Sequence, residues 1–321
     1  MNPRTDEPHS CEDVNPLGFR VALIIPTHNA SQHWQALHEG IRNQSLKLHE
    51  VIVIDSSSKD QTVLDAQRAG FTVIQIDSRD FNHGGTRQLA AVHASQADIL
   101  IYLTQDAIPR GSDAFKNIVA VFADPVVGGA YGRQLPRESA GAIESHARHF
   151  NYPAVSNVRA WDSRQILGFK SIFFSNSFGA YRRDALASVG GFSSDVIFGE
   201  DTVVVAKLHR AGWKTTYVAD ATVEHSHAFS IPEEFGRYFD IGVLHAREPW
   251  LIEEFGTASG EGRRFVLSEL HYLLRHNPFL IPSAMLRTLI KYVGYKTGKL
   301  EKKFTPRIKS RLGLNKAYWS R

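Results

Sequence analysis

The sequence is poor in cysteine and has no long apolar run. Cys11 is the only cysteine among 321 residues, which excludes a disulfide framework and a cysteine-rich metal site and is typical of a reducing cytoplasm. No stretch approaches the ~20 apolar residues that a membrane-spanning helix needs, and residues 1–12 lack the apolar centre of a secretory signal peptide. We therefore expect a cytoplasmic chain that does not cross a bilayer.

An excess of charge of one sign is also lacking, except at the C-terminal end. Residues 291–321 hold ten Lys or Arg and the single acid Glu301, whereas residues 1–290 hold 27 bases and 32 acids. Because the larger part of the chain is acidic, nucleic acid is not an expected partner. With 43% hydrophobic residues the chain can bury a substantial core. We expect a flexible tail over residues 1–18, an α/β domain over 19–230 and a basic helical extension over 231–321.

The extension contains NPFLIPSAMLRTLIKYVGYKTGK, in which apolar and basic residues recur at the spacing of an amphipathic helix. Two arrangements suit such a helix equally well. Its apolar face either packs on the main domain, with the basic end solvated, or lies on the anionic inner face of the cytoplasmic membrane. In the second case each nearby base contributes on the order of 1 kcal/mol.

The first half of the chain alternates short β-branched runs with helical patterns. The runs VALIIPT, EVIVID, FTVIQ and ADILIYL predict strands, and the segments between them have helical spacing. Strands that are apolar on both faces and separated by helices predict a parallel sheet covered on both sides. In such a sheet, ligands bind beyond the carboxyl ends of the strands.

Two carboxylates follow such strands. Asp55 ends the second run, where it can accept hydrogen bonds from a ribose or a base, while Ser58 or Asp60 can cap the next helix. Asp106 lies in LTQDA after a later strand. There it either holds a divalent cation against a diphosphate or caps a turn before Pro109.

The stretch FNHGGTR, residues 81–87, lies between a predicted strand and a predicted helix. Paired glycines permit a close approach to the backbone, and a loop that opens a helix offers free N–H groups to an anion. Most Gly-Gly pairs are only turns. A phosphate site is therefore one of two interpretations of this stretch.

The second half contributes two acids and two histidines. FGEDTVVVAKLHRAGW places Glu200 and Asp201 at the start of a predicted helix, where acids stabilise the helix dipole by about 0.3–1 kcal/mol and need no other role. TVEHSH puts His225 and His227 on the same side of an extended segment. That spacing suits a metal ion, and it is also common among surface histidines.

In this order along one chain, the segments resemble the inverting nucleotide-sugar glycosyltransferases of family 2, which have the GT-A fold with a Rossmann-like, mostly parallel sheet. The resemblance runs from Val21 to about His227, through VALIIPTHNA, VIVIDSSSKDQT, LTQDA, SNSFGAYRRDALASVGGF, GED and ATVEHSH. FNHGGTR, TQDA and the ending KYVGYKTGK…YW are similar to bacterial rhamnosyltransferases that use dTDP-L-rhamnose to build cell-surface polysaccharides. Residues 19–230 would then form the GT-A domain.

The resemblance implies a role for each segment. Asp106 and His225 would hold Mg²⁺ or Mn²⁺ on the donor diphosphate, and Asp201, with Glu200 beside it, would take the proton from the acceptor hydroxyl. Single displacement would invert the anomeric carbon of dTDP-β-L-rhamnose and give an α-L-rhamnoside. The implied donor-binding residues are Thr27, Asn29, Asp55, Asn82, His83, Gly84, Gly85, Arg87, Gln105 and Asp106.

The implied acceptor is a glycan, such as an O-antigen saccharide linked to polyprenyl diphosphate at the inner membrane face. The candidate acceptor contacts are Trp161, Asn176, His227 and Trp250, and for each aromatic residue core packing is the alternative. The sequence departs from the family at Gln105, because the usual metal motif has two carboxylates and TQDA has one, which weakens the expected metal affinity.

Three other interpretations stay open. One is another nucleotide-sugar transferase of the same fold. A second is a nucleotidyltransferase, which would release pyrophosphate where a sugar transferase releases a nucleoside diphosphate. The third is a catalytically inert subunit that binds a sugar nucleotide.

Overall fold

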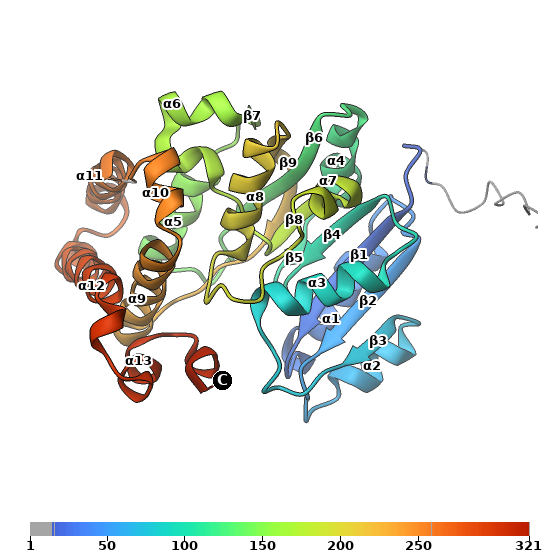
Figure 1. Ribbon diagram of the computed structural model, residues 1–321, viewed down its shortest axis with the longest axis horizontal. Helices are drawn as coiled ribbons and strands as arrows, with labels where there is room; N and C mark the ends of the chain where they lie inside the picture. Colours follow the sequence, from blue (N-terminus) through green and yellow to red (C-terminus); the bar gives the residue numbers. More distant parts are fainter. Residues whose placement is uncertain (1–14, 16, 258, 321) are drawn as a thin grey trace, which may run out of the picture.

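The structure is a computed structural model that describes residue 15 and residues 17–257 and 259–320; Cys11 and most of the predicted tail lie outside the described residues. Within these ranges, nine strands form one sheet in the order β3-β2-β1-β4-β8-β6-β9-β5, and β7 pairs with β9 (Figure 1). The strands are β1 (Val21–Thr27), β2 (Glu50–Asp55), β3 (Thr72–Gln75), β4 (Ile99–Leu103), β5 (Ile108–Pro109), β6 (Val127–Leu135), β7 (Asn157–Arg159), β8 (Phe178–Arg182) and β9 (Lys214–Glu224).

Helices cover both faces of the sheet, and a group of helices follows the last strand (Figure 1). Those between strands are α1 (Ser31–Arg42), α2 (Thr62–Arg68), α3 (His83–His93), α4 (Ala114–Ala120), α5 (Ala142–Asn151), α6 (Arg164–Leu167), α7 (Arg183–Ser188) and α8 (Glu200–Arg210). After β9 come α9 (Ile231–Arg247), α10 (Pro249–Phe255), α11 (Ser259–His276), α12 (Ile281–Lys299) and α13 (Pro306–Leu312).

The two halves of the sheet differ in strand direction. Strands β1 to β4 are parallel neighbours, as the alternation of strands and helices predicted. Strand β8 then runs antiparallel to both β4 and β6, and β9 runs parallel to β6. The end of β4, the start of β8 and the ends of β6 and β9 therefore meet at one edge, where Thr104 N donates to Ser177 O (3.2 Å) and His225 N to Leu135 O (3.0 Å).

Each face of the sheet has its own buried cluster, because successive residues of a strand point to opposite sides. On one face, Ile24 belongs to a cluster that includes Val204 of α8. On the other face, Ile25 belongs to a cluster that includes Leu37 of α1 and Phe115 of α4. The central strands are thus apolar on both faces, as a sheet covered by helices on both sides requires.

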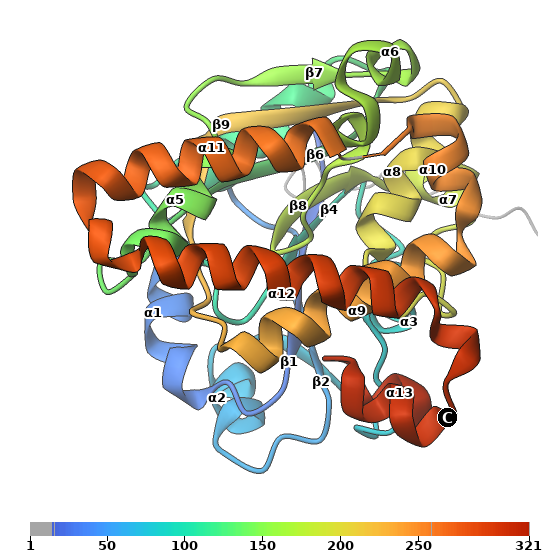
Figure 2. The same ribbon diagram turned by 90° about the vertical axis from the view of Figure 1, so that its left-hand side faces the viewer.

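The helical extension packs on the rest of the chain through α9, along which α12 runs (Figure 2). The contact is close, since a Cβ on Gly298 would lie 2.0 Å from Phe239 O and a Cβ on Gly242 would lie 2.3 Å from Tyr295 O. The opposite side of α12 leaves apolar side chains exposed, namely Met285, Leu286, Leu289, Tyr292 and Val293. One face of the predicted amphipathic helix therefore packs on the protein, and the apolar side chains of the other face are exposed.

In the described part of the chain, no helix combines the length and the apolar character that crossing a membrane demands. The predicted boundary at residue 230 lies in the connection between β9 and α9. The division of the chain into a domain over 19–230 and an extension over 231–321 stays a prediction.

Candidate active site

A cavity of about 450 Å³ lies at the carboxyl ends of β1, β2 and β4. Its lining includes six residues that the sequence singled out, namely Thr27, His83, Arg87, Gln105, Asp106 and His227. The lining residues that the sequence analysis missed are Pro26, His28, His33, Ser56, Ser78, Phe81 and Thr104. Three of these, His28, Ser56 and Thr104, directly follow β1, β2 and β4, so the rule that drew attention to strand ends was sufficient to find them.

Asp106, His225 and His227 form a compact group of possible metal ligands at this cavity. Asp106 Oδ2 lies 3.5 Å from His225 Nε2 and 3.4 Å from His227 Nε2, and ligand atoms of all three lie within 4.8 Å of one another. Both histidines follow β9, so their spacing turns both rings to the same side. His227 is a predicted acceptor contact whose spacing from His225 also suits a metal ion, and the structure places it beside the two residues expected to bind the metal.

Gln134 on β6 orients the His225 ring. Gln134 Oε1 accepts a hydrogen bond from Arg148 Nη1 (2.7 Å) and lies 3.0 Å from His225 Nδ1, while Gln134 Nε2 donates to Ser175 Oγ (2.9 Å). Because an amide oxygen can only accept, His225 carries its proton on Nδ1 and turns the lone pair of Nε2 toward Asp106. A ring held in this tautomer is prepared to bind a metal ion.

The electrostatics of this group also suit a cation. Burial lowers the pKa of His227 to about 4, and burial lowers the pKa of His225 despite the nearby carboxylate. Burial by itself would raise the pKa of Asp106, but hydrogen bonding to His225 and the positive charge that both histidines carry when protonated hold it well below its usual range. At neutral pH an ionised carboxylate therefore faces two neutral imidazoles, which is the protonation state that metal ligands need.

Gln105 stands in LTQDA where the family usually has a second carboxylate, and its amide has a structural role. Its side chain accepts a hydrogen bond from His28 N (2.8 Å) and donates one to His28 O (3.1 Å). A carboxylate can make the first bond but has no proton for the second. Gln105 thus joins the loop after β1 to the loop after β4, and Asp106 is left as the carboxylate of this motif.

The carboxylate of Asp55 is fully buried and is bound by neighbouring protein groups. Thr27 Oγ1 donates to Asp55 Oδ2 (3.0 Å), and Ser58 N donates to Asp55 Oδ1 (2.8 Å). Asn29 Oδ1 accepts a hydrogen bond from Lys59 N (2.9 Å). These bonds tie the loops after β1 and β2 together; direct contact of Asp55 or Asn29 with a donor stays a prediction.

The two glycines of FNHGGTR are explained by contacts within the protein. Asn82 is the N-cap of α3, and its side chain accepts a hydrogen bond from Gly85 N. A Cβ on Gly85 would lie 2.7 Å from the Asn82 amide nitrogen, and a Cβ on Gly84 would lie 1.9 Å from Ser193 O. The close approach that the glycines permit is thus made by the cap and by the loop around residue 193. Donor contacts of Asn82, Gly84 and Gly85 stay predictions.

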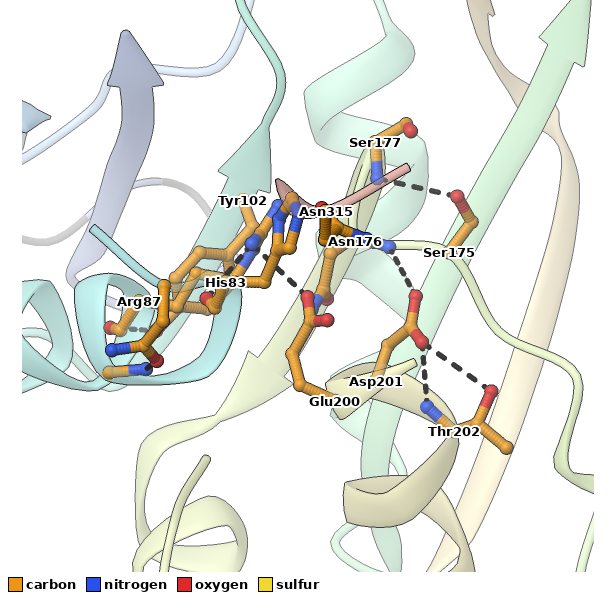
Figure 3. A network of polar contacts seen from close by, with 12 residues as sticks. His83, Arg87, Tyr102, Ser175, Asn176, Ser177, Glu200, Asp201, Thr202 and Asn315 are labelled. Atoms are coloured by element: carbon orange, nitrogen blue, oxygen red, sulfur yellow. Dashed lines mark hydrogen bonds and ion pairs between the residues drawn. The ribbon is translucent and has the colours of Figure 1, made fainter. Parts of the chain in front are cut away.

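Arg87 connects the cavity to the acid pair at the start of α8 (Figure 3). Arg87 Nη1 donates to His83 O (3.0 Å) and lies 3.1 Å from Glu200 Oε1. Both side chains of this ion pair are 6% exposed, so salt screens it little. Asn176 Nδ2 donates to the same Glu200 oxygen (3.1 Å), and Asn176 N donates to Asp201 Oδ2 (3.2 Å). Asn176, expected at the acceptor, therefore holds both acids in place.

The two acids have different electrostatic environments. Burial and the negative charge of Glu200 raise the pKa of Asp201 to about 7, although the N–H groups of Thr202 and Asn176 bind its carboxylate. Burial acts on Glu200 in the same direction, but the charge of Arg87, the nearby His83 and the hydrogen bond from Asn176 together outweigh it and lower the pKa of Glu200. A carboxylate with a pKa near neutrality is suited to accept a proton from a substrate.

The two candidate acceptor tryptophans have packing partners within the chain. Trp161 meets Phe255 edge-on, with ring centroids 5.5 Å apart. Trp250 lies under Arg210, whose Cζ is 4.6 Å from the ring centroid, and its Nε1 donates to Glu248 (2.7 Å). These contacts match the packing alternative, and an acceptor role for either tryptophan stays a prediction.

A sheet of this topology, with a cavity at the strand ends beside possible metal ligands, is the arrangement found in GT-A glycosyltransferases. Residues 22–190 match the model of the family described as glycosyl transferase family 2, and the chain belongs to this family. It is a glycosyltransferase, as the motifs predicted.

Two curated relatives match nearly the whole chain. The chain is 45% identical over 303 residues to the O-antigen chain rhamnosyltransferase RfbN of Salmonella typhimurium, covering 94% of this chain and 96% of that protein. It is 41% identical over 299 residues to the O-antigen chain rhamnosyltransferase WbaN of Salmonella anatum, covering 93% and 95%.

Solved structures share the fold at lower identity. The mannosyltransferase PcManGT from Pyrobaculum calidifontis, in complex with GDP-Man and Mn²⁺, is similar with a TM-score of 0.56 and 20% identity, over 94% of this chain and 85% of that one. S. aureus TarS 1-349 in complex with UDP-GlcNAc is similar with a TM-score of 0.52 and 15% identity, over 88% and 91%.

Proposed function

We propose that this glycosyltransferase transfers L-rhamnose from dTDP-β-L-rhamnose to a hydroxyl of an O-antigen saccharide carried on polyprenyl diphosphate, with inversion of the anomeric carbon. Two relatives named O-antigen chain rhamnosyltransferases, at 45% and 41% identity, support the sugar and the class of acceptor. The observation that carries the mechanism is the position of Arg87, which lines the cavity that also holds Asp106 and pairs with the acid beside Asp201.

On the donor side, Asp106, His225 and His227 would hold the divalent cation. The fit rests on the chemistry of the three ligands, one ionised carboxylate and two neutral imidazoles, of which His225 has its Nε2 lone pair turned inward. Imidazole nitrogen suits Mn²⁺ better than Mg²⁺, which prefers oxygen ligands, so Mn²⁺ is the favoured ion. When bound, the cation stabilises the charge that develops on the leaving diphosphate.

On the acceptor side, Asp201 is the proposed general base and Glu200 is its neighbour. The Asp201 carboxylate would take the proton of the acceptor hydroxyl while that oxygen attacks the anomeric carbon and the bond to the diphosphate breaks. Asn176 N and Thr202 N, 3.2 and 2.7 Å from the Asp201 oxygens, hold the carboxylate in place through this step. One displacement inverts the configuration, so a β-linked donor gives an α-L-rhamnoside.

Calorimetry on the purified protein tests the donor. We expect dTDP-L-rhamnose to bind more tightly than UDP-glucose and UDP-GlcNAc, and Mn²⁺ to strengthen its binding. Asp201→Ala should abolish transfer and leave donor binding nearly unchanged. Binding of UDP sugars alone would contradict the proposed donor, release of pyrophosphate would indicate a nucleotidyltransferase, and binding without hydrolysis or transfer would indicate an inert subunit.

We also propose that the exposed face of α12 and the residues after it lie on the anionic inner face of the cytoplasmic membrane, which places the site near a lipid-linked acceptor. Phe279, just before α12, is 92% exposed and Leu289 is 56% exposed. Glu301, the only acid after residue 290, is buried and pairs with Arg247 and Lys309. The exposed bases around it, Lys296, Lys299, Lys302 and Lys303, therefore face solvent without this acid to compensate them.

Sedimentation with lipid vesicles tests this surface. We expect binding to vesicles that contain phosphatidylglycerol, weaker binding at high salt, and little binding to phosphatidylcholine alone. Leu286→Ser should weaken binding, whereas Leu64→Ser, on α2 and exposed to nearly the same extent (48% against 47%), should not. Equal loss in both variants would contradict the proposed surface.

A further inference from the structure

The C-terminal end of the chain returns to the region of the cavity. After α13 the segment 313–319 lies against α9 (Figure 2). Asp240 of α9, about 1% exposed, accepts hydrogen bonds on Oδ2 from Leu314 N (3.1 Å) and from Asn315 N and Nδ2 (both 2.9 Å). A Cβ on Gly236 would lie 3.0 Å from Leu314 N, so the segment packs directly on the backbone of α9.

These bonds determine which way the Asn315 amide faces. Asn315 Nδ2 donates to Asp240, so Oδ1 is the atom turned to His83, 3.2 Å from His83 Nε2 (Figure 3). An amide oxygen can only accept, so the His83 ring carries its proton on Nε2 and Nδ1 is left as an acceptor. Burial lowers the pKa of His83, which keeps the ring neutral.

We propose that Asn315 is a positioning residue of the donor site: through the chain Asp240, Asn315 and His83 it holds the His83 imidazole in one orientation and one tautomer at the cavity wall. His83 lines the same cavity as Arg87 and Asp106. With its only N–H directed at Asn315 Oδ1, the neutral ring can accept from a hydroxyl through Nδ1 and has no N–H left to donate to a phosphate oxygen. His83 is therefore suited to a hydroxyl of the donor sugar, and the neighbouring cationic Arg87 is suited to phosphate.

This inference rests on the proposed function only where it names the donor. The rest of the C-terminal segment supplies an internal control, because two hydrogen bonds of Tyr318 hold it without involving His83. Tyr318 Oη donates to Asp195 O (2.7 Å) and accepts from Arg247 Nη1 (2.7 Å). Tyr318→Phe removes these bonds and keeps the ring, so it loosens the segment and leaves the Asn315 amide in place.

The first test is the tautomer of His83 in the ligand-free, full-length protein, read by ¹⁵N NMR of labelled histidines with His83→Gln used to assign the signal. We expect the Nε2–H form in the wild-type protein and in Tyr318→Phe, and exchange between tautomers in Asn315→Ala. An Nδ1–H or doubly protonated ring in the wild-type protein would overturn the proposal, and this result needs no folded Asn315 variant.

The second test compares the affinities for dTDP-L-rhamnose and for dTDP. Asn315→Ala should weaken binding of the sugar nucleotide about five- to tenfold, the usual effect of one hydrogen bond, and change that of dTDP less than about twofold. Tyr318→Phe should change neither by more than about twofold. Equal losses for both ligands would overturn the contact with the sugar. If another sugar nucleotide proves to be the donor, the proposed function fails, and the same comparison with its own nucleoside diphosphate decides the role of Asn315.

Discussion

The pH dependence of transfer tests the assignment of Asp201 as the base. Burial and the charge of Glu200 raise its pKa to about 7, well above the ~3.9 of an ordinary aspartate. Only the ionised form accepts a proton, so kcat should rise about tenfold between pH 6 and pH 8. A base with an ordinary pKa would show no such rise in this range.

Glu200→Gln is the perturbation that identifies the titrating group. The substitution removes the negative charge beside Asp201 and retains an oxygen for the hydrogen bond from Asn176 Nδ2. It also leaves Arg87 without its ionic partner. Both changes favour ionised Asp201, so the rise in kcat should move to lower pH by about one unit or more, where one unit corresponds to about 1.4 kcal/mol.

The assay is kcat at saturating donor and acceptor across pH 5 to 9, for the wild-type protein, Glu200→Gln and Asp201→Asn. Asp201→Asn should lose ~10²–10⁴-fold in kcat and show no rise near pH 7. The reasoning is refuted if the rise stays at the same pH in Glu200→Gln, or if Asp201→Asn keeps the wild-type profile.

Stability should depend on the same pKa with the opposite sign. An acid whose pKa is raised by folding binds its proton more tightly in the folded chain, so the free energy of unfolding falls as pH rises from about 4 to about 7. Asp201→Asn removes this fall. By urea unfolding, the variant should gain stability relative to the wild-type protein above pH 7 and not at pH 4; an equal difference at both values would exclude a raised pKa.

Two further predictions concern the glycine pair and the metal ligands. Gly84→Ala should lower the free energy of unfolding, measured with urea, by roughly 1–3 kcal/mol, because the added Cβ would lie 1.9 Å from Ser193 O. Gly141→Ala, where a Cβ meets nothing within 4 Å, should leave the free energy of unfolding nearly unchanged. Similar effects of the two substitutions would reject the packing explanation. His227→Ala should weaken Mn²⁺ binding in calorimetry by about tenfold or more. The exposed His149 serves as the control, since its substitution should leave Mn²⁺ affinity unchanged. If neither variant loses Mn²⁺ affinity, or if both lose it equally, His227 is not a metal ligand.

Local patterns were sufficient for the N-terminal half of the fold. Alternating strands and helices predicted the parallel arrangement of β1 to β4, and the strand-end rule led to Asp55 and Asp106, while the resemblance to the family led to Thr27. The rule works because parallel strands with crossover helices place all their carboxyl ends at one edge. The strand-end rule did not distinguish Asp106, which lines the cavity, from Asp55, which is fully buried and whose carboxylate accepts hydrogen bonds from the loops after β1 and β2.

The roles of other residues depended on the contacts that they make in the folded chain. The glycines of FNHGGTR suggested a ligand, and the structure fills the space beside Gly84 with the backbone of Ser193. Gln105 suggested a weakened metal site, which stays a prediction, and only the structure shows that its amide makes two hydrogen bonds to the backbone of His28. No spacing in the sequence reveals these partners, because they come from segments far away in the chain.

The sequence by itself determined the family, the parallel half of the sheet and the residue types of the site, since these follow from periodicities and motifs within short windows. Only the tertiary structure decided that His227 joins Asp106 and His225, because the reversed direction of β8 brings the ends of β4, β6 and β9 to one edge. It alone also decided that Asn315 meets His83 across 232 positions of the chain, a contact made by packing of α9 and α13 that no local pattern encodes.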